Sequence, residues 1–433
     1  MKFKKESACT RPQAAMLCAV AIVLLMFAKG AFASGPVEKV IYSFLGQDDA
    51  TMPMAGLVAD GAGNLYGTSL AGGDSTCGCG SVFELSPPAL PGGVWTESVI
   101  YSFQGDSTDG RSPYGTLIID KLGNLYGTTS DFPTRSGTVF ELSPPTAPGG
   151  AWTHNRLYRF PANGVAGSGP FGKLVIDGKG HLYGTTLVGG RQVGTVFELT
   201  PAATSGAPWS EVVLHNFGKP GDGSEPNKNL ILHGGALYGT TPDGFVFQLV
   251  IESGRWTEKI LYEFPFNSFG GPGDGLVFDS AGNLYGTLTA GGTSTNCQLG
   301  CGAIFELSPP AVPGDRWVNT TLYNFTDGPD GATPRATLII DKAGNLYGTA
   351  SNNAPGVTST SNDGTAFELS PPAVPGGEWT ETTLHEFGNT HSDGSVPQGE
   401  VILIRGKLYG TTSRGGTSQR CSEGCGTVFS IAP

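Results

Sequence analysis

The residues of this sequence best suited to chemistry are carboxylates in a recurrent loop motif, Asp-Gly-x-x-Pro. The motif occurs four times in full and once in a degenerate copy, and its acids are Asp49, Asp109, Asp222, Asp330 and Asp393. Carboxylate oxygens are the ligands that calcium prefers, and the ion takes roughly six to eight of them. If the loops surround one opening, their acids form a ring that binds a cation such as calcium.

A simpler interpretation makes the same acids turn formers, because an Asp side chain accepts hydrogen bonds from backbone N–H groups of its own turn. Two copies of the loop lack the acid: Ala166 replaces it in one, and the other reads Gly270-Gly271-Pro272. Spacing along the chain does not show that the five acids converge. Both interpretations stand, and the sequence names no cofactor beyond calcium as a candidate ion.

Six cysteines follow residue 33, and they fall in three close pairs: Cys77 and Cys79, Cys297 and Cys301, Cys421 and Cys425. Even-numbered pairs in an exported protein predict disulfides. Proximity favours closure within each pair, although a Cys-Gly-Cys bridge is expected to be strained. Cross-pairing between the first and the third pair is the alternative. Zinc binding is disfavoured because no histidine accompanies any pair.

Residues that break the repeat are better candidates for binding than residues that maintain it. In the loops expected to share a face with the acids, these are Arg135, Arg191, Phe266, Phe269, His391 and Arg414. Aromatic rings within reach of Asp and Arg side chains suit a saccharide or a peptide, and the variability of exposed loops explains them equally well. No nucleophile elbow, zinc-protease motif or phosphate-binding glycine loop occurs, so an enzymatic activity is not indicated.

A unit that occurs seven times must position these residues. Its most regular part is the segment Leu-Tyr-Gly-Thr, whose tyrosines are Tyr66, Tyr126, Tyr183, Tyr238, Tyr285, Tyr347 and Tyr409. Each unit predicts four strands: a short apolar run such as residues 116–119, the Leu-Tyr-Gly-Thr strand, a Val-Phe-Glu-Leu strand, and a strand that starts with tryptophan and ends with phenylalanine. The glycine of the second strand is expected to let a neighbouring sheet approach closely.

The two ends of the chain predict how this array closes. Residues 37–44 match a fourth strand, and residues 400–431 supply a first, second and third strand without a fourth. The N-terminal strand therefore completes the last sheet, as in a closed β-propeller. We expect an all-β, seven-bladed β-propeller of four-stranded blades over residues 34–433. The loops from strand two to three and from strand four to one then share a face.

Residues 1–33 have the features of a signal peptide. A basic start precedes the apolar residues 14–28 and the cleavage site Ala31-Phe32-Ala33. The apolar run is shorter than the about 20 residues that a membrane span needs. Five of the 25 Lys and Arg and one of the 37 Asp and Glu lie in this segment, so the remaining chain has a net charge near −16. That charge argues against nucleic acid and anionic membranes as partners.

The segments Gly-Asn-Leu-Tyr-Gly-Thr-Thr, Gly-Thr-Val-Phe-Glu-Leu and Trp-Thr-Glu resemble the GloVer tandem repeats of exported bacterial proteins, and the resemblance covers residues 37–431. It implies export and repetition, and it brings no catalytic residues with it. Many proteins of this kind carry a C-terminal surface anchor. This chain stops at Pro433 without one, so covalent attachment to a surface is not expected.

These observations predict an exported, monomeric binding protein or interaction scaffold that is extracellular, associated with the cell surface or periplasmic. We expect a site for a glycan, a peptide or a cation on the loop-rich face, and an extracellular glycan or protein as the partner. No stable membrane span is expected after signal cleavage. The alternative is a secreted glycan-acting hydrolase or lyase with its site on the same face, for which analogy of fold is the only support.

Overall fold

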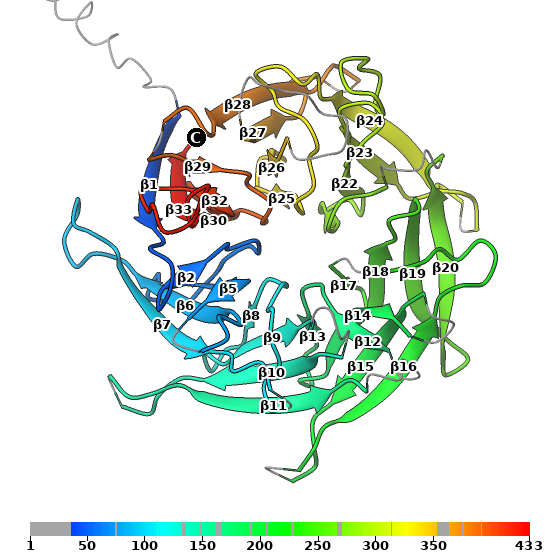
Figure 1. Ribbon diagram of the computed structural model, residues 1–433. Coiled ribbons are helices and arrows are strands. Elements are labelled where there is room, and N and C mark those ends of the chain that lie inside the picture. Colours follow the sequence, from blue (N-terminus) through cyan, green and yellow to red (C-terminus); the bar gives the residue numbers. More distant parts are fainter. Residues whose placement is uncertain are drawn as a thin grey trace, which may run out of the picture.

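The chain forms a ring of seven antiparallel sheets around a central axis (Figure 1). The structure, a computed structural model, describes residues 36–433 except residues 74–75, 107, 132–135, 148, 162–166, 190–192, 205–206, 227–228, 266–270, 313, 353–362, 375 and 391. Over these residues the regular elements are strands. No helix in this part of the chain has the length and apolar character of a membrane span. The expected all-β, seven-bladed β-propeller is confirmed.

Two strands of each blade lie nearest the axis. The first strands are two or three residues long: β3 (Val58–Ala59), β8 (Ile118–Ile119), β13 (Val175–Ile176), β17 (Ile231–His233), β21 (Val277–Phe278), β25 (Ile339–Ile340) and β30 (Ile402–Ile404). The second strands carry the Leu-Tyr-Gly-Thr motif: β4 (Leu65–Ser69), β9 (Leu125–Thr129), β14 (Leu182–Val188), β18 (Ala236–Thr240), β22 (Leu284–Leu288), β26 (Leu346–Ala350) and β31 (Lys407–Thr412). We number the blades 1 to 7 in this order.

The outer half of each blade is longer. The third strands are β6 (Ser81–Ser86), β10 (Thr138–Ser143), β15 (Thr195–Thr200), β19 (Phe245–Glu252), β23 (Ala303–Ser308), β27 (Thr365–Ser370) and β33 (Thr427–Ala432). The fourth strands are β7 (Thr96–Ser102), β11 (Thr153–Arg159), β16 (Ser210–Asn216), β20 (Arg255–Glu263), β24 (Val318–Asn324), β28 (Thr380–Glu386) and, in blade 7, β1 (Val37–Ser43). Blade 7 therefore combines the two ends of the chain.

Closure of the ring follows the prediction. Strand β1 pairs antiparallel with β33, from Val37 opposite Ala432 to Ser43 opposite Thr427. Figure 1 shows the blue N-terminal strand beside the red C-terminal one. An open array would leave unpaired N–H and C=O groups along the outer edge of β33, and this pairing removes that edge. The N-terminal strand completes the last blade.

Short pairings outside the blades show that two kinds of loop share one face. In blade 7, β29 (Gly394–Ser395) of the loop before the first strand pairs with β32 (Arg414–Gly415) of the loop after the second strand. Strands β2 (Ala50–Thr51) and β5 (Ala71–Gly72) pair in the same way in blade 1. In blade 3, β12 (Ser168–Pro170) pairs with β14. The four-to-one and two-to-three loops therefore lie together, as expected, and we call their side the loop face.

The glycine of the Leu-Tyr-Gly-Thr strand accommodates a ring of its own sheet. Gly67 stands opposite Phe83 in the β4–β6 pairing, and a Cβ on it would lie 2.4 Å from the Phe83 ring and 3.0 Å from Leu57. The same crowding by the third-strand phenylalanine recurs in the other blades. The expectation that a neighbouring sheet makes this close approach is wrong, because the phenylalanine belongs to the same blade.

Blades pack on one another through aromatic side chains. Phe44, which follows β1 in blade 7, meets Phe83 of blade 1 with ring centroids 4.9 Å apart, and both side chains are fully buried. Trp152 of blade 2 meets Tyr66 of blade 1 with centroids 5.7 Å apart. Equivalent tryptophan–tyrosine contacts link blades 1 and 7, 4 and 3, and 6 and 5. The repeated aromatic residues thus form the interfaces between blades.

Candidate functional site

The five motif acids are each bound within their own blade. Asp109 follows β7 and is 1% exposed, and its Oδ2 accepts hydrogen bonds from the Tyr101 hydroxyl at 3.0 Å and from the Gln104 N–H at 2.8 Å. Asp49 and Asp330 accept equivalent bonds from strand-four tyrosines at 3.1 and 3.0 Å. Each acid therefore ties the loop after strand four to the end of that strand.

Histidine replaces the tyrosine in two of these loops. His215 Nε2 lies 3.5 Å from Asp222 Oδ2, and His385 Nε2 lies 3.2 Å from Asp393 Oδ2. Both aspartates also accept a backbone N–H of their own loop, from Gly218 and from Gly388 respectively. The five acids thus stand at five separate positions around the ring, and among the described residues they do not gather into one group.

A glutamate of the next blade lies beside two of these acids. Glu97 on β7 lies beside Asp49, and burial followed by the charge of Asp49 raises the pKa of Glu97 to about 8. Burial raises the pKa of Glu381, beside Asp330, to about 7. The same strand position holds Glu211, where burial raises the pKa to about 7. These glutamates hold a proton near neutral pH at the interface between two blades.

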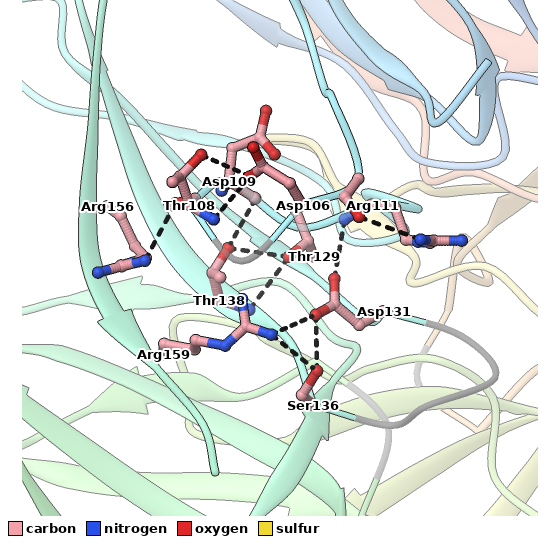
Figure 2. Close-up of polar contacts among 11 residues, drawn as sticks. Asp106, Thr108, Asp109, Arg111, Thr129, Asp131, Ser136, Thr138, Arg156 and Arg159 are labelled. Atoms are coloured by element: carbon pink, nitrogen blue, oxygen red, sulfur yellow. Dashed lines mark hydrogen bonds and ion pairs between the residues drawn. The ribbon is translucent and has the colours of Figure 1, made fainter. Parts of the chain in front are cut away.

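Figure 2 shows how the loop of Asp109 is fastened to blade 2. The Asp109 carbonyl accepts a hydrogen bond from the Thr138 hydroxyl on β10, and Arg156 on β11 donates to the Thr108 carbonyl at 3.4 Å. Asp131, 5% exposed, accepts the N–H of Arg111 at 2.8 Å and the Ser136 hydroxyl at 2.7 Å. Arg159 approaches the same carboxylate at 3.6 Å. This network joins the loop that connects blade 1 to blade 2 with the strands of blade 2, so its role is structural.

Most of the residues predicted from broken repeats lie outside the described residues: Arg135, Arg191, Phe266, Phe269 and His391. Arg414 is described, and it forms an exposed ion pair with Glu423 at 2.8 Å. Arg414 and Asp393 line one open hollow of about 710 Å³ on the loop face of blade 7. Two of the predicted binding residues are therefore brought to one surface.

The three cysteine pairs close locally. Disulfides join Cys77 to Cys79, Cys297 to Cys301 and Cys421 to Cys425, with Cα–Cα distances of 5.1 to 5.2 Å. Each pair lies in a two-to-three loop and ends just before strand three. The favoured local pairing is the one present. Disulfides persist in oxidising compartments, so they support an exported protein.

A smaller cavity of about 290 Å³ lies on the axis itself. Its lining comes from the residues just before the first strand of every blade, and includes in blade order Met54, Tyr114, Phe171, Asn229, Asp274, Arg335 and Glu400. The four-to-one loops reach the axis at these residues, so the cavity opens toward the loop face. Its polar and aromatic lining is the arrangement that small-molecule sites use.

Contacts across the axis hold the charged side chains in place. Lys173 of blade 3 donates to Glu400 of blade 7 at 2.5 Å, and the Glu400 side chain is 7% exposed. Asn229 of blade 4 donates to Thr337 of blade 6 at 3.0 Å and accepts the N–H of Lys173 at 2.8 Å. Side-chain contacts thus join blade 3 to blade 7 and blade 4 to blade 6 at the centre.

The aromatic part of the lining is a pair of rings beside an ion-pairing group. Tyr114 and Phe171 have ring centroids 4.1 Å apart. Burial raises the pKa of the Tyr114 phenol, while the nearby Arg335 opposes the shift and Asp274 adds to it. The buried Nε of Arg335 has no hydrogen-bond partner among the described residues. The Arg335 side chain is part of the cavity lining, and its guanidinium nitrogens are hydrogen-bond donors.

The axial residues have a common place in the repeat that the sequence shows. Each follows the proline that precedes a first strand by one to three positions, as in Pro113-Tyr114 and Pro334-Arg335. The first position after this proline holds a different residue in each of the seven units, while the strands around it repeat. The residues predicted from broken repeats lie in the longer loops, and this short segment is not among them.

Comparison with known proteins places the repeat. A family model described as the Gloeobacter/Verrucomicrobia repeat matches residues 31–248 and 241–433. No curated protein matches the chain.

Among solved structures, the β-propeller domain of Cps50 (Swd1) from Myceliophteria thermophila is 8% identical, with a TM-score of 0.50 over 92% of this chain and 100% of that one. The extracellular domain assigned to a one-component system from B. thetaiotaomicron is 10% identical, with a TM-score of 0.49, and the match covers 90% of this chain and 40% of that one. The PQQ-bound aldose sugar dehydrogenase of Streptomyces coelicolor is 11% identical, with a TM-score of 0.41 over 92% and 98% of the two chains. The likeness to the Cps50 (Swd1) domain shows the propeller fold alone.

Proposed function

The chain belongs to the Gloeobacter/Verrucomicrobia repeat family, and we propose that it is an exported binding protein. We propose further that its axial cavity holds a saccharide unit. The observation that carries the proposal is the contrast between the axis and the blades. The strand positions of the unit repeat, whereas the position just after the proline that precedes each first strand, which supplies Tyr114, Phe171 and Arg335 to the cavity, holds a different residue in all seven units. A repeat position that serves packing is filled alike in each copy, so unlike filling supports recognition of an asymmetric ligand.

The chemistry of the lining favours a sugar. Aromatic rings pack against the C–H faces of a pyranose, and Tyr114 and Phe171 supply two adjacent rings. Hydroxyl groups both donate and accept hydrogen bonds, and the wall offers Asp274 as an acceptor and Arg335 as a donor. A volume of about 290 Å³ admits a single sugar unit rather than a folded peptide. A longer glycan would enter by one end from the loop face.

The location of the protein is part of the proposal. Three disulfides favour an oxidising compartment, and residues 1–33 are expected to direct export and to be removed. The protein would then meet extracellular, surface-bound or periplasmic glycans as a monomer. Its acidic balance suits neutral polymers or cations better than anionic ones.

Calorimetric titration of the full chain, exported and purified, with a panel of oligosaccharides tests the proposal. We expect saturable binding of one class, weakened at least tenfold, or about 1.4 kcal/mol, by Tyr114→Ala and by Arg335→Ala. Arg316→Ala is the matched control, because Arg316 is exposed in the connection from strand three to strand four, on the opposite face. Binding that survives both axial changes, or that the control also removes, would contradict the axial site.

A secreted glycan-acting hydrolase or lyase is the second outcome of the same experiment. The cavity region holds two carboxylates, Asp274 and Glu400, and Lys173 occupies Glu400 at 2.5 Å. That contact already engages the Glu400 carboxylate within the protein. Chromatography of the panel after incubation would show shortened or unsaturated products if this alternative holds, and unchanged oligosaccharides if the protein only binds them.

A further inference from the structure

Two positions between blades hold a histidine and two carboxylates. His215 and Asp222 of blade 3 meet Glu258 of blade 4, and His385 and Asp393 of blade 6 meet Glu38 of blade 7. Within each group one ligand atom per residue lies within 4.8 Å of the others. They are the two places where histidine replaces the tyrosine at the end of strand four in a blade that retains the loop aspartate.

The first group is closed and incompletely bonded. The side chains of His215, Asp222 and Glu258 are 10%, 7% and 11% exposed. His215 Nε2, Asp222 Oδ2 and Glu258 Oε1 are all buried without a hydrogen-bond partner among the described residues. A buried polar atom that makes no hydrogen bond costs roughly 1–3 kcal/mol, so three at one point call for an additional partner.

The blades that keep tyrosine show what is missing. At the same position between blades 5 and 6, the Tyr323 hydroxyl donates to Asp330 at 3.0 Å and Glu381 lies beside them. Tyrosine is thus a donor that fits the aspartate. An imidazole protonated at Nδ1, whose Nε2 faces two carboxylates, offers a lone pair instead, and such a set of one nitrogen and two oxygens matches a metal ion.

We propose that His215, Asp222 and Glu258 bind a divalent transition metal, with zinc as the ion of choice, and that Glu38, His385 and Asp393 form a second copy of the site. Each metal would join two adjacent blades, because its ligands come from both.

The distances suit zinc. His215 Nε2 stands 3.5 Å from Asp222 Oδ2 and 3.3 Å from Glu258 Oε2, and His385 Nε2 stands 3.2 Å from Asp393 Oδ2. Two ligand atoms each about 2.1 Å from zinc at a tetrahedral angle lie about 3.4 Å apart. Three protein ligands leave one position for water. Calcium takes roughly six to eight oxygens and no nitrogen, so these groups do not suit it.

The backbone also orients the ligands. Asp222 accepts the Gly218 N–H through Oδ1 at 3.0 Å, which leaves Oδ2 directed at the imidazole. Asp393 accepts the Gly388 N–H at 3.1 Å and the Gly394 N–H at 2.8 Å. Hydrogen bonds of this kind fix a carboxylate for metal binding.

Equilibrium dialysis of the purified full chain against zinc chloride, followed by elemental analysis, tests the proposal. We expect two tightly held zinc ions per chain in the natural protein, one in His215→Tyr and none in the double variant with His385→Tyr. These substitutions restore the residue that other blades use, so the fold is expected to survive. The reverse change, Tyr323→His, creates the same set with Asp330 and Glu381 and should add one zinc.

Zinc content that does not change across this series would overturn the proposal, since it would place the metal on the other histidines. So would a natural protein that holds no more zinc than the double variant. Circular dichroism checks the fold of each variant, and His215→Gln replaces His215→Tyr if the latter is unfolded. Cobalt added in place of zinc gives an independent readout, because its visible absorption in the natural protein should fall by about half in each single variant and vanish in the double one.

Discussion

The inner rim of the propeller and the interfaces between its blades are built from the same repeated unit, yet they follow opposite rules. Between blades, a strand-four tyrosine or histidine, a loop aspartate and a residue of the next blade recur with few changes around the ring. At the axis, the residues before each first strand differ, and they run from Met54 through Tyr114 to Arg335 and Glu400. One region conserves its contacts through the ring and the other does not.

This difference separates stability from recognition within one chain. A contact that recurs around the ring is specified again in each copy that makes it, so a change there affects the packing of one blade on the next. A residue at the axis meets the others only once, and it is free to differ. This distinction would fail if a repeated residue could be replaced without loss of stability, or if the stability of the fold depended on an axial residue.

The largest effect is expected inside a blade. Gly127 lies opposite Phe140, and a Cβ on it would stand 2.6 Å from that ring and 2.8 Å from Leu117. Both neighbours are fully buried and have no room to move. Gly127→Val should therefore lower the free energy of unfolding by about 3 kcal/mol through overpacking, as measured by urea denaturation.

Gly178→Ala is the matched control for this change. Gly178 is exposed in the turn after β13, and an added Cβ would meet nothing within 4 Å. Its effect should stay within about 0.5 kcal/mol. Equal losses in the free energy of unfolding for the two substitutions would mean that glycine is needed for the backbone conformation, and that space for the phenylalanine ring is not the reason for it.

A smaller effect concerns the protons held between blades. Burial raises the pKa of Glu211 and Glu381 to about 7, and burial with the charge of Asp49 raises that of Glu97 to about 8, from an ordinary 4.5. A group whose pKa is higher in the folded than in the unfolded protein stabilises the fold fully at pH values below its unfolded pKa. This stabilisation is lost as the pH rises through its folded pKa. The melting temperature should fall by about 5 °C between pH 5 and pH 8.5, taking roughly 1 kcal/mol per glutamate after screening by solvent.

Glu97→Gln identifies the source of this dependence. Glutamine has no proton to lose, so the variant should match the natural protein at pH 5 and exceed it by about 1 kcal/mol at pH 8.5. Glu263→Gln, at an exposed position of β20, is expected to leave the pH profile unchanged. A melting temperature that rises with pH would show that these glutamates are ionised in the folded protein.

The fold was largely accessible from the sequence because its signals are local and repeated. Asp60 shows why: its Oδ1 accepts the N–H groups of Ala62, Gly63 and Asn64, so the turn is encoded within five residues. Closure by β1 followed from counting strands at the two ends. The expectation for Gly67 was wrong because a sequence does not show whether the group that fills the space above a glycine belongs to its own sheet or to the neighbouring one.

The candidate sites were less accessible because they depend on proximity around a ring. Glu400 and Lys173 are 227 residues apart, and only closure brings blade 7 opposite blade 3. In the repeat, His215 takes the place of the strand-four tyrosine. Its approach to Glu258 depends on the packing of the next blade, and no spacing along the chain encodes that distance.

The smallest effect on stability is expected at the axis. Arg335 is half-buried, and its Nε has no hydrogen-bond partner among the described residues. Its backbone carbonyl accepts the Asp274 N–H at 2.7 Å, and a substitution of the side chain retains this hydrogen bond. Arg335→Ala should therefore change the free energy of unfolding by no more than about 0.5 kcal/mol, although it weakens saccharide binding at least tenfold. Urea denaturation and calorimetric titration of the same preparation measure the two effects together. A loss of stability near 3 kcal/mol would place Arg335 with Gly127 among the residues that hold the ring, and the division between axis and blades would fail.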